Sequence, residues 1–173
     1  DRLTGVEVAE VDETMRPIPG TERDIPCDTL LLSVGLLPEN ELSQQAGVRL
    51  DAVTGGPEVG DDLSTSIPGV FACGNVVHVH DLVDFVSGES ETAGAAAAAY
   101  VQNGEIETET VLPLAAGDGI GYTVPQHIRL DGVQKSVSVS FRVRRNYGPS
   151  TITVRCGPNK IAAFKRERLA PGE

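Results

Sequence analysis

Hydrophobic and polar positions divide the chain into an α/β part and a later all-β part. Residues 3–11 alternate loosely and predict a strand, and residues 15–24, which are polar and contain Pro and Gly, predict a hairpin loop. Residues 27–34 are a continuous apolar run between turn signals, as expected of a strand that is covered on both faces. A turn at residues 67–69 is expected to lead into a short apolar strand at residues 70–73.

Two helices are expected in this first part. Residues 41–46 predict a short helix that ends at Gly47, because glycine is favoured just after a helix end. A long helix is predicted from about Asp84 to Gln102, followed by Gly104 as its stop. Its run of alanines offers little bulk, so this helix can lie very close to a sheet or a ligand.

The pattern changes to short strands from Ile120 onward. Residues 135–145 alternate strictly, with serines and arginines on one face and apolar side chains on the other: Val137, Val139, Phe141 and Val143. Residues 151–156 repeat the alternation, and residues 161–164 predict a further strand. The turn signals between these segments indicate antiparallel pairing of neighbours along the chain.

Length and composition agree with two small domains. The chain has 173 residues, 40% of them hydrophobic and 4% aromatic, which is typical of a soluble globular protein. We predict an α/β domain at residues 1–112, a linker at 113–119 and a small antiparallel β domain at 120–173. No segment is long and apolar enough to predict a membrane span, and no signal peptide opens the chain. The chain begins at Asp1 without methionine, which suggests a processed, trimmed or excised piece.

Cysteine usage favours a cytoplasmic protein. Cys27, Cys73 and Cys156 are odd in number, widely spaced and not arranged as C-x-x-C. This pattern argues against a disulfide framework and against a cysteine zinc site. We therefore expect three buried cytosolic thiols.

The net charge of −11 conceals two regions of opposite sign. Residues 134–173 contain nine Lys and Arg against two Glu, a local charge of +7, which leaves −18 on the other 133 residues. The arginines alternate with apolar residues and lack interleaved aromatics, so a solvated strand face is favoured over a nucleic-acid surface. The two regions suggest units that attract each other, or a basic face that docks an acidic protein partner.

Residues 65–75 carry the most specific motif, Thr-Ser-Ile-Pro-Gly-Val-Phe-Ala-Cys-Gly-Asn. A buried strand that ends in glycine and a short polar side chain before a helix places backbone amides at a sheet edge, where open α/β sheets bind cofactors. The motif resembles the second FAD-contacting motif of the pyridine nucleotide-disulfide oxidoreductases, T-x-x-P-x-[IV]-[FY]-A-x-G-D. Residues 28–40 resemble the segment in which that family's chain returns to its FAD domain, D-x-V-[LIV]-x-[AS]-x-G-x-x-P-N, with Glu39 as an insertion.

The resemblance implies a partial FAD/NAD(P)-binding three-layer fold and assigns cofactor contacts to four residues. Gly74 and Asn75 match the family's G-D pair, whose acid binds a ribitol hydroxyl of FAD, and an amide oxygen can accept the same bond without charge. Leu82 and Val83 open the long helix, whose free N–H groups are expected to face the flavin pyrimidine edge. The G-N pair and residues 78–81 fit the non-disulfide subgroup associated with glycerol-3-phosphate or amine and amino-acid dehydrogenases.

Both glycine-rich nucleotide fingerprints of that family are missing from these residues. We therefore expect the C-terminal part of a parent flavoprotein that uses FAD and NAD(P), with an isolated chain that is inactive and binds FAD poorly. A chain that holds only part of the parent's sheet exposes strand edges that the rest of the parent would cover. Exposed edges pair readily with other chains, so a homo-oligomer or a partner dehydrogenase subunit is expected. The alternatives are a non-enzymatic interaction module with a basic β face, and a redox-inactive α/β domain.

Other chemical signals are weak. His78 and His80 are two residues apart and have no third candidate ligand at a diagnostic spacing, so residues near the cofactor or on the surface are favoured over metal ligands. Residues 117–121 resemble a phosphate loop but lead into a strand, and we interpret them as a linker. No residue is assigned as catalytic and none as a metal ligand.

Overall fold

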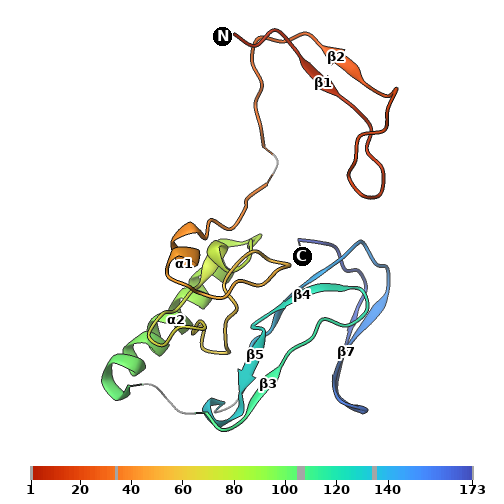
Figure 1. The fold of residues 1–173 in the computed structure, drawn as a ribbon. Coiled ribbons are helices and arrows are strands. Elements are labelled where there is room, and N and C mark those ends of the chain that lie inside the picture. Colours follow the sequence, from red (N-terminus) through yellow and green to blue (C-terminus); the bar gives the residue numbers. More distant parts are fainter. Residues whose placement is uncertain (1, 34, 105–107, 134–135, 173) are drawn as a thin grey trace. The chain divides into compact units, whose positions relative to one another are not determined.

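The computed structural model describes residues 2–33, 35–104, 108–133 and 136–172 (Figure 1). These residues fall into two compact units, Asp1–Gly35 and Leu36–Glu173, and each is described by itself. The predicted boundary at residues 113–119 does not coincide with this division, and it stays a prediction about domain organisation.

The first unit is a β-hairpin. β1 (Val6–Val8) pairs antiparallel with β2 (Arg23–Ile25). The predicted strand at residues 3–11 is thus confirmed over its centre. The predicted loop at residues 15–24 was drawn too long, because its last two residues belong to β2. An Asp12 turn shapes the loop: its Oδ1 accepts hydrogen bonds from the backbone N–H groups of Thr14 (2.8 Å) and Arg16 (3.0 Å).

The predicted buried strand at residues 27–34 is wrong over its described part. Residues 27–33 form no strand, and Leu31 and Leu32 are 89% and 74% exposed; Val34 lies outside the described residues. A strand is stabilised by hydrogen bonds to a neighbour, and none of the described residues pairs with this run. Apolar composition alone therefore does not make it a strand.

Both predicted helices are confirmed. α1 (Glu41–Gln45) ends in a Schellman motif, in which Gly47 donates to the Gln44 carbonyl and Val48 to the Ser43 carbonyl, both at 2.9 Å. α2 (Val83–Asn103) ends at Gly104, whose φ of 77° is accessible to glycine. Within the described residues, no helix is both long and apolar enough to cross a bilayer.

In the motif at residues 65–75, the expected turn is present, since Val70 N–H donates to the Ile67 carbonyl (3.1 Å), but the expected strand at residues 70–73 is reduced to a single β-bridge. Ser64 and Phe71 form an isolated β-bridge, Thr65 N–H donates to the Val70 carbonyl (2.9 Å), and Ala72 N–H donates to the Leu63 carbonyl (3.0 Å). Residues 70–73 are therefore one limb of a tight antiparallel turn. The correction has a simple cause, because in the described residues this segment finds an antiparallel neighbour and no parallel one.

The C-terminal region is antiparallel β structure, as predicted. β3 (Val111–Pro113) pairs with β5 (His127–Arg129), β4 (Ile120–Val124) with β6 (Ser140–Val143), and β7 (Ser150–Cys156) with β8 (Asn159–Arg166). The predicted strand at residues 135–145 is shortened to β6, because residues 136–139 are unpaired; Lys135 lies outside the described residues. The three-layer fold stays a prediction, since the described residues form only two-stranded antiparallel sheets.

A small shared core joins these elements. It contains five buried residues, which come from the segments on either side of the turn motif, from α2 and from β4: Val59, Leu63, Val77, Ala93 and Val124. Polar contacts close it, since the Gln126 side chain accepts a hydrogen bond from Val59 N–H (2.8 Å) and Gln126 N–H donates to the Val59 carbonyl (3.0 Å). The expectation of three buried thiols is wrong, because Cys27 and Cys73 are half-buried and Cys156 is exposed.

Gly56 and Gly88 provide a matched test of this packing. A Cβ at Gly56 would overlap the backbone carbonyl of the buried Val77, so Gly56→Ala should lower the free energy of unfolding by about 3 kcal/mol. Gly88 lies inside α2 with open space at its Cβ position, so Gly88→Ala should raise that free energy by about 1 kcal/mol. Urea unfolding followed by circular dichroism measures both variants, and equal stabilities would contradict the packing described here.

Candidate functional site

Gly74 begins the segment that connects the motif to α2. It starts the short 3₁₀ helix η1 (Gly74–Val76), is buried, and has a φ of 71°. Its N–H donates to Oε2 of Glu89 at 2.8 Å, which fastens the motif to the second turn of α2. A Cβ here would stand 3.2 Å from Cγ1 of Val86, so glycine suits both the backbone conformation and the close approach.

Asn75 is exposed, and its carboxamide oxygen already has a partner. Asn75 Oδ1 accepts a hydrogen bond from His80 N–H at 3.1 Å, which shapes the loop before α2. A carbonyl oxygen has two lone pairs and the amide nitrogen is a donor, so the side chain retains capacity for a ligand. Whether Asn75 contacts a flavin stays a prediction.

Leu82 and Val83 stand at the start of α2 and are 58% and 74% exposed. Leu82 is the N-cap residue, and no side chain caps the helix there. The first N–H groups of the helix therefore lack the usual side-chain acceptor, and they carry the partial positive charge of a helix N-terminus. This geometry agrees with the role predicted for these two residues without testing it.

Two histidines and a glutamate meet beside this helix start. His78 Nε2 lies 3.1 Å from Oε1 of Glu89, and His80 Nε2 lies 3.0 Å from Oε2 of the same carboxylate. Burial by itself raises the pKa of Glu89, but the bonds from His78 and Gly74 and the charge of His80 outweigh it and lower the pKa. Of the two alternatives expected for these histidines, a surface position is wrong, because their side chains are 7% and 4% exposed; a position near the cofactor stays a prediction.

A second polar chain extends from His78 to the β strands. Tyr122 Oη lies 3.5 Å from His78 Nδ1 and accepts a hydrogen bond from Arg142 Nε at 3.0 Å. The Arg142 guanidinium also donates to the Val79 carbonyl (3.0 Å) and to Asp81 Oδ2 (2.7 Å). Although burial lowers the pKa of Arg142, the bond to Tyr122 and the charge of Asp81 raise it overall.

The two histidines open onto a cavity of about 200 Å³. Phe85 of α2, Tyr122 of β4 and Arg142 of β6 line the same cavity. The loop before α2 and the β strands thus enclose a space that neither forms alone.

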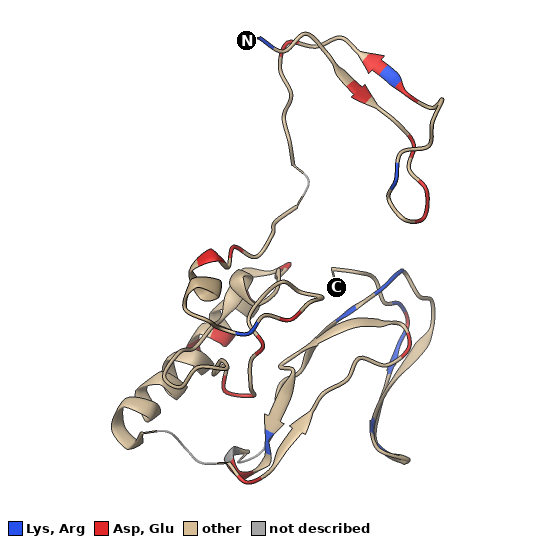
Figure 2. Cartoon of the chain, in the orientation of Figure 1, with Lys and Arg blue, Asp and Glu red and all other residues tan. Residues whose placement is uncertain are grey.

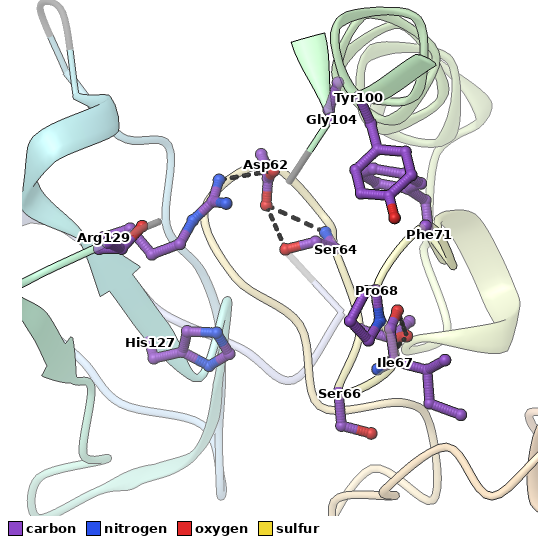
Figure 3. A pocket seen from close by; sticks show the side chains of 14 residues that line it. Asp62, Ser64, Ser66, Ile67, Pro68, Phe71, Tyr100, Gly104, His127 and Arg129 are labelled. Carbon is purple, nitrogen blue, oxygen red and sulfur yellow. Dashed lines mark hydrogen bonds and ion pairs between the residues drawn. The ribbon is translucent and has the colours of Figure 1, made fainter. Parts of the chain in front are cut away.

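The residues of the turn motif line a different cavity, of about 230 Å³ (Figure 3). Phe71 packs edge-to-face on Tyr100 of α2, with ring centroids 6.2 Å apart. Across the cavity, Arg129 pairs with Asp62 at 2.5 Å (Figure 3). Burial and the charge of Arg129 lower the pKa of the nearby His127.

Sequence reasoning missed Glu89, Tyr122 and Arg142. Glu89 lies nine residues beyond His80, and this spacing is not typical of residues that bind the same ligand. Residues 117–121 do lead into strand β4, as expected, while their interpretation as a domain linker stays a prediction.

Comparison with known proteins gives a family for most of the chain. The family described as pyridine nucleotide-disulphide oxidoreductase matches residues 2–107, which include the turn motif, η1 and α2. The β strands that follow lie outside the matched range. No solved structure matches the chain.

Three curated relatives are oxidoreductases by name. The chain is 30% identical over 116 residues to the glutamate synthase [NADPH] small chain of Mycobacterium tuberculosis, covering 66% of this chain and 24% of that protein. It is 36% identical over 78 residues to the probable ferredoxin reductase CtmF of Castellaniella defragrans, covering 43% of this chain and 18% of that protein. It is 29% identical over 89 residues to the NADH oxidase of Methanocaldococcus jannaschii, covering 51% and 18%. The matches thus span a quarter or less of each relative's length.

The lowered pKa of His127 predicts a pH-dependent contribution to stability. Below the ordinary value of 6.5, the unfolded chain binds a proton that folded His127 does not, so the free energy of unfolding falls as the pH drops. His127→Asn removes this titration and should make the fall shallower. Urea unfolding across a pH series measures both slopes, and identical slopes would show that the folded state does not perturb His127.

Proposed function

This chain belongs to the pyridine nucleotide-disulphide oxidoreductase family, and we propose that it forms one wall of a flavin site in an FAD-dependent NAD(P)H oxidoreductase. The enzyme would pass hydride or electrons from NAD(P)H through FAD to a partner or acceptor. The proposal rests on one observation: the Gly74 turn leads, through a short loop, to a start of α2 that is exposed and has no side-chain cap. FAD and NAD(P) are the cofactors that the family implies.

The residues at this junction fit a flavin. Gly74 keeps the backbone free of a side chain at the turn, and Asn75 offers an amide to a hydroxyl group. The amides at Leu82 and Val83 would stabilise negative charge at the edge of a ring bound against them. When bound, FAD supplies the hydride acceptor and donor, while these residues position it and balance its charge.

We place the enzyme in the non-disulfide subgroup that accompanies glycerol-3-phosphate or amine and amino-acid dehydrogenases. The G-N pair at residues 74–75 supports this placement, as do the histidines that follow it. The three cysteines are unpaired and form no C-x-x-C, so the acceptor would not be a disulfide within these residues. Unpaired thiols also support a cytoplasmic location.

Asn75 gives the sharpest test of the flavin wall. In the flavoprotein that contains residues 1–173, Asn75→Asp should tighten FAD binding by about fivefold, because a charge-assisted hydrogen bond replaces a neutral one. Asn75→Ala should weaken it by about the same factor. Quenching of flavin fluorescence on titration measures both affinities.

Asn146→Asp is the matched control, because this exposed residue lies in a turn between β6 and β7, far along the chain from the motif. It should leave FAD affinity unchanged. If neither substitution at Asn75 alters the affinity while the control behaves as expected, Asn75 does not contact the flavin.

The ADP half of FAD would be held by residues outside this chain, because both glycine-rich fingerprints are missing from it. We therefore expect residues 1–173 on their own to bind FAD weakly and to be inactive. Titrating the purified chain with FAD measures this directly, and micromolar quenching would contradict it.

A second candidate function, docking of an acidic protein surface, is favoured by the β7–β8 hairpin. Lys and Arg positions recur along this hairpin (Figure 2). Its exposed basic side chains are Arg155, Lys160, Lys165 and Arg166, and none of them pairs with an acidic side chain among the described residues. The rest of the chain is strongly acidic, so a second copy is a suitable partner, as is an acidic dehydrogenase subunit.

Charge reversal tests this docking surface. We expect the protein to self-associate at low salt and to dissociate as salt screens the charges. The double variant Lys160→Glu, Lys165→Glu should remain dissociated at low salt, whereas Glu91→Gln on α2 should behave like the unaltered protein. Sedimentation velocity measures the state, and a monomer at low salt would exclude self-association through this face.

A further inference from the structure

His78, His80 and Glu89 bring three ligand atoms together from two segments of the chain. The histidines lie in the loop between η1 and α2, and Glu89 lies in the second turn of α2. One ring nitrogen from each histidine and one carboxylate oxygen all lie within 4.8 Å of one another. Such a group can converge on one metal ion with modest side-chain adjustment, since zinc–nitrogen and zinc–oxygen bonds are about 2.0–2.2 Å long.

The cluster is shielded from water, and one of its ring nitrogens lacks a hydrogen bond. The side chains of His78, His80 and Glu89 are 7%, 4% and 15% exposed. His80 Nε2 lies close to the Glu89 carboxylate, yet it has no hydrogen-bond partner among the described residues. A buried nitrogen left without a partner is costly, and a metal ion placed between the rings and the carboxylate would satisfy it.

The contact to Tyr122 gives Nδ1 of His78 a neighbour that can hold the ring proton in place. Tyr122 Oη accepts a hydrogen bond from Arg142 and lies 3.5 Å from His78 Nδ1, so Nδ1 can donate its proton to the same oxygen. Without a metal, His78 Nε2 is hydrogen-bonded to Glu89 Oε1; a metal at Nε2 would replace that bond, and the ring proton would then sit on Nδ1, facing Tyr122 Oη. Histidine ligands commonly have such an outer partner, which fixes the ring orientation.

The neighbouring cavity leaves room for a further ligand. It has a volume of about 200 Å³, and both histidines reach it. Three protein ligands with an open position are typical of catalytic zinc sites, and two histidines with one carboxylate also suit Fe²⁺. The nitrogen-rich donor set disfavours Mg²⁺ and Ca²⁺, which prefer oxygen ligands.

We propose that His78, His80 and Glu89 bind one divalent first-row transition-metal ion, with a water or small ligand from the adjacent cavity at its open position. The proposal rests on these side chains alone and is independent of flavin binding. Glu89 Oε2 can continue to accept the Gly74 N–H while the carboxylate ligates the metal, because each oxygen has two lone pairs.

Zinc and cobalt binding by the purified protein tests the site. After removal of metals with a chelator and addition of Zn²⁺ in excess, elemental analysis should find one Zn²⁺ per chain. Co²⁺ at the same site should show the intense visible absorption of four- or five-coordinate cobalt.

Substitutions separate this site from adventitious binding. Glu89→Gln retains an oxygen for the Gly74 N–H, and both Glu89→Gln and His80→Asn should weaken Zn²⁺ binding by about a hundredfold or more. Glu91→Gln, an exposed position two residues along α2, and His127→Asn should leave it unchanged. Circular dichroism checks that each variant is folded.

Zinc should also raise the thermal unfolding temperature of the unaltered protein, a measurement that needs no variant. Failure to bind Zn²⁺ or Co²⁺ would overturn the proposal and leave the cluster as a buried ion pair. Binding that survives in both Glu89→Gln and His80→Asn would overturn it as well. Neither result bears on the affinity for FAD, so the flavin proposal stands or fails separately.

Discussion

The carboxylate of Glu89 is the contact on which the centre of the second unit depends. It accepts the N–H of Gly74 and lies within 3.1 Å of both His78 and His80, so one side chain of α2 holds three points of the preceding loop. Removing one member of such a buried group leaves the others unpaired, which costs more than the bond itself contributes. The turn, the loop and the helix start are therefore expected to shift together.

Hydrogen bonds and ion pairs are important for the stability of this unit because its apolar core is small. Five buried residues form the main cluster, and one of them is an alanine. Contacts such as Arg142 to Asp81 and Arg129 to Asp62 link the β strands to the motif region around that core. The β strands consequently line part of both cavities.

Sequence patterns over a few neighbouring residues correctly predicted the helix ends and the C-terminal hairpin, because short-range interactions determine these features. Gly47 and Gly104 marked the helix ends correctly, because a left-handed residue after a helix is a property of a few neighbouring residues. The hairpin β7–β8 followed from alternation and its turn. The apolar run at residues 27–33 did not become a strand, because strand formation depends on a distant partner that the run itself does not specify.

The same distinction explains why the histidine cluster escaped notice. His78 and His80 were visible as a pair, but the third member is supplied by a helix, and its direction depends on how α2 packs against η1. The Gly74 turn contributes to that packing, since a Cβ there would stand 3.2 Å from Cγ1 of Val86. The glycine of the flavin motif also donates its N–H to Glu89, the carboxylate that lies beside the two histidines. The two proposed sites therefore share one short stretch of chain, because Gly74 bonds to Glu89 and Asn75 bonds to the backbone of His80.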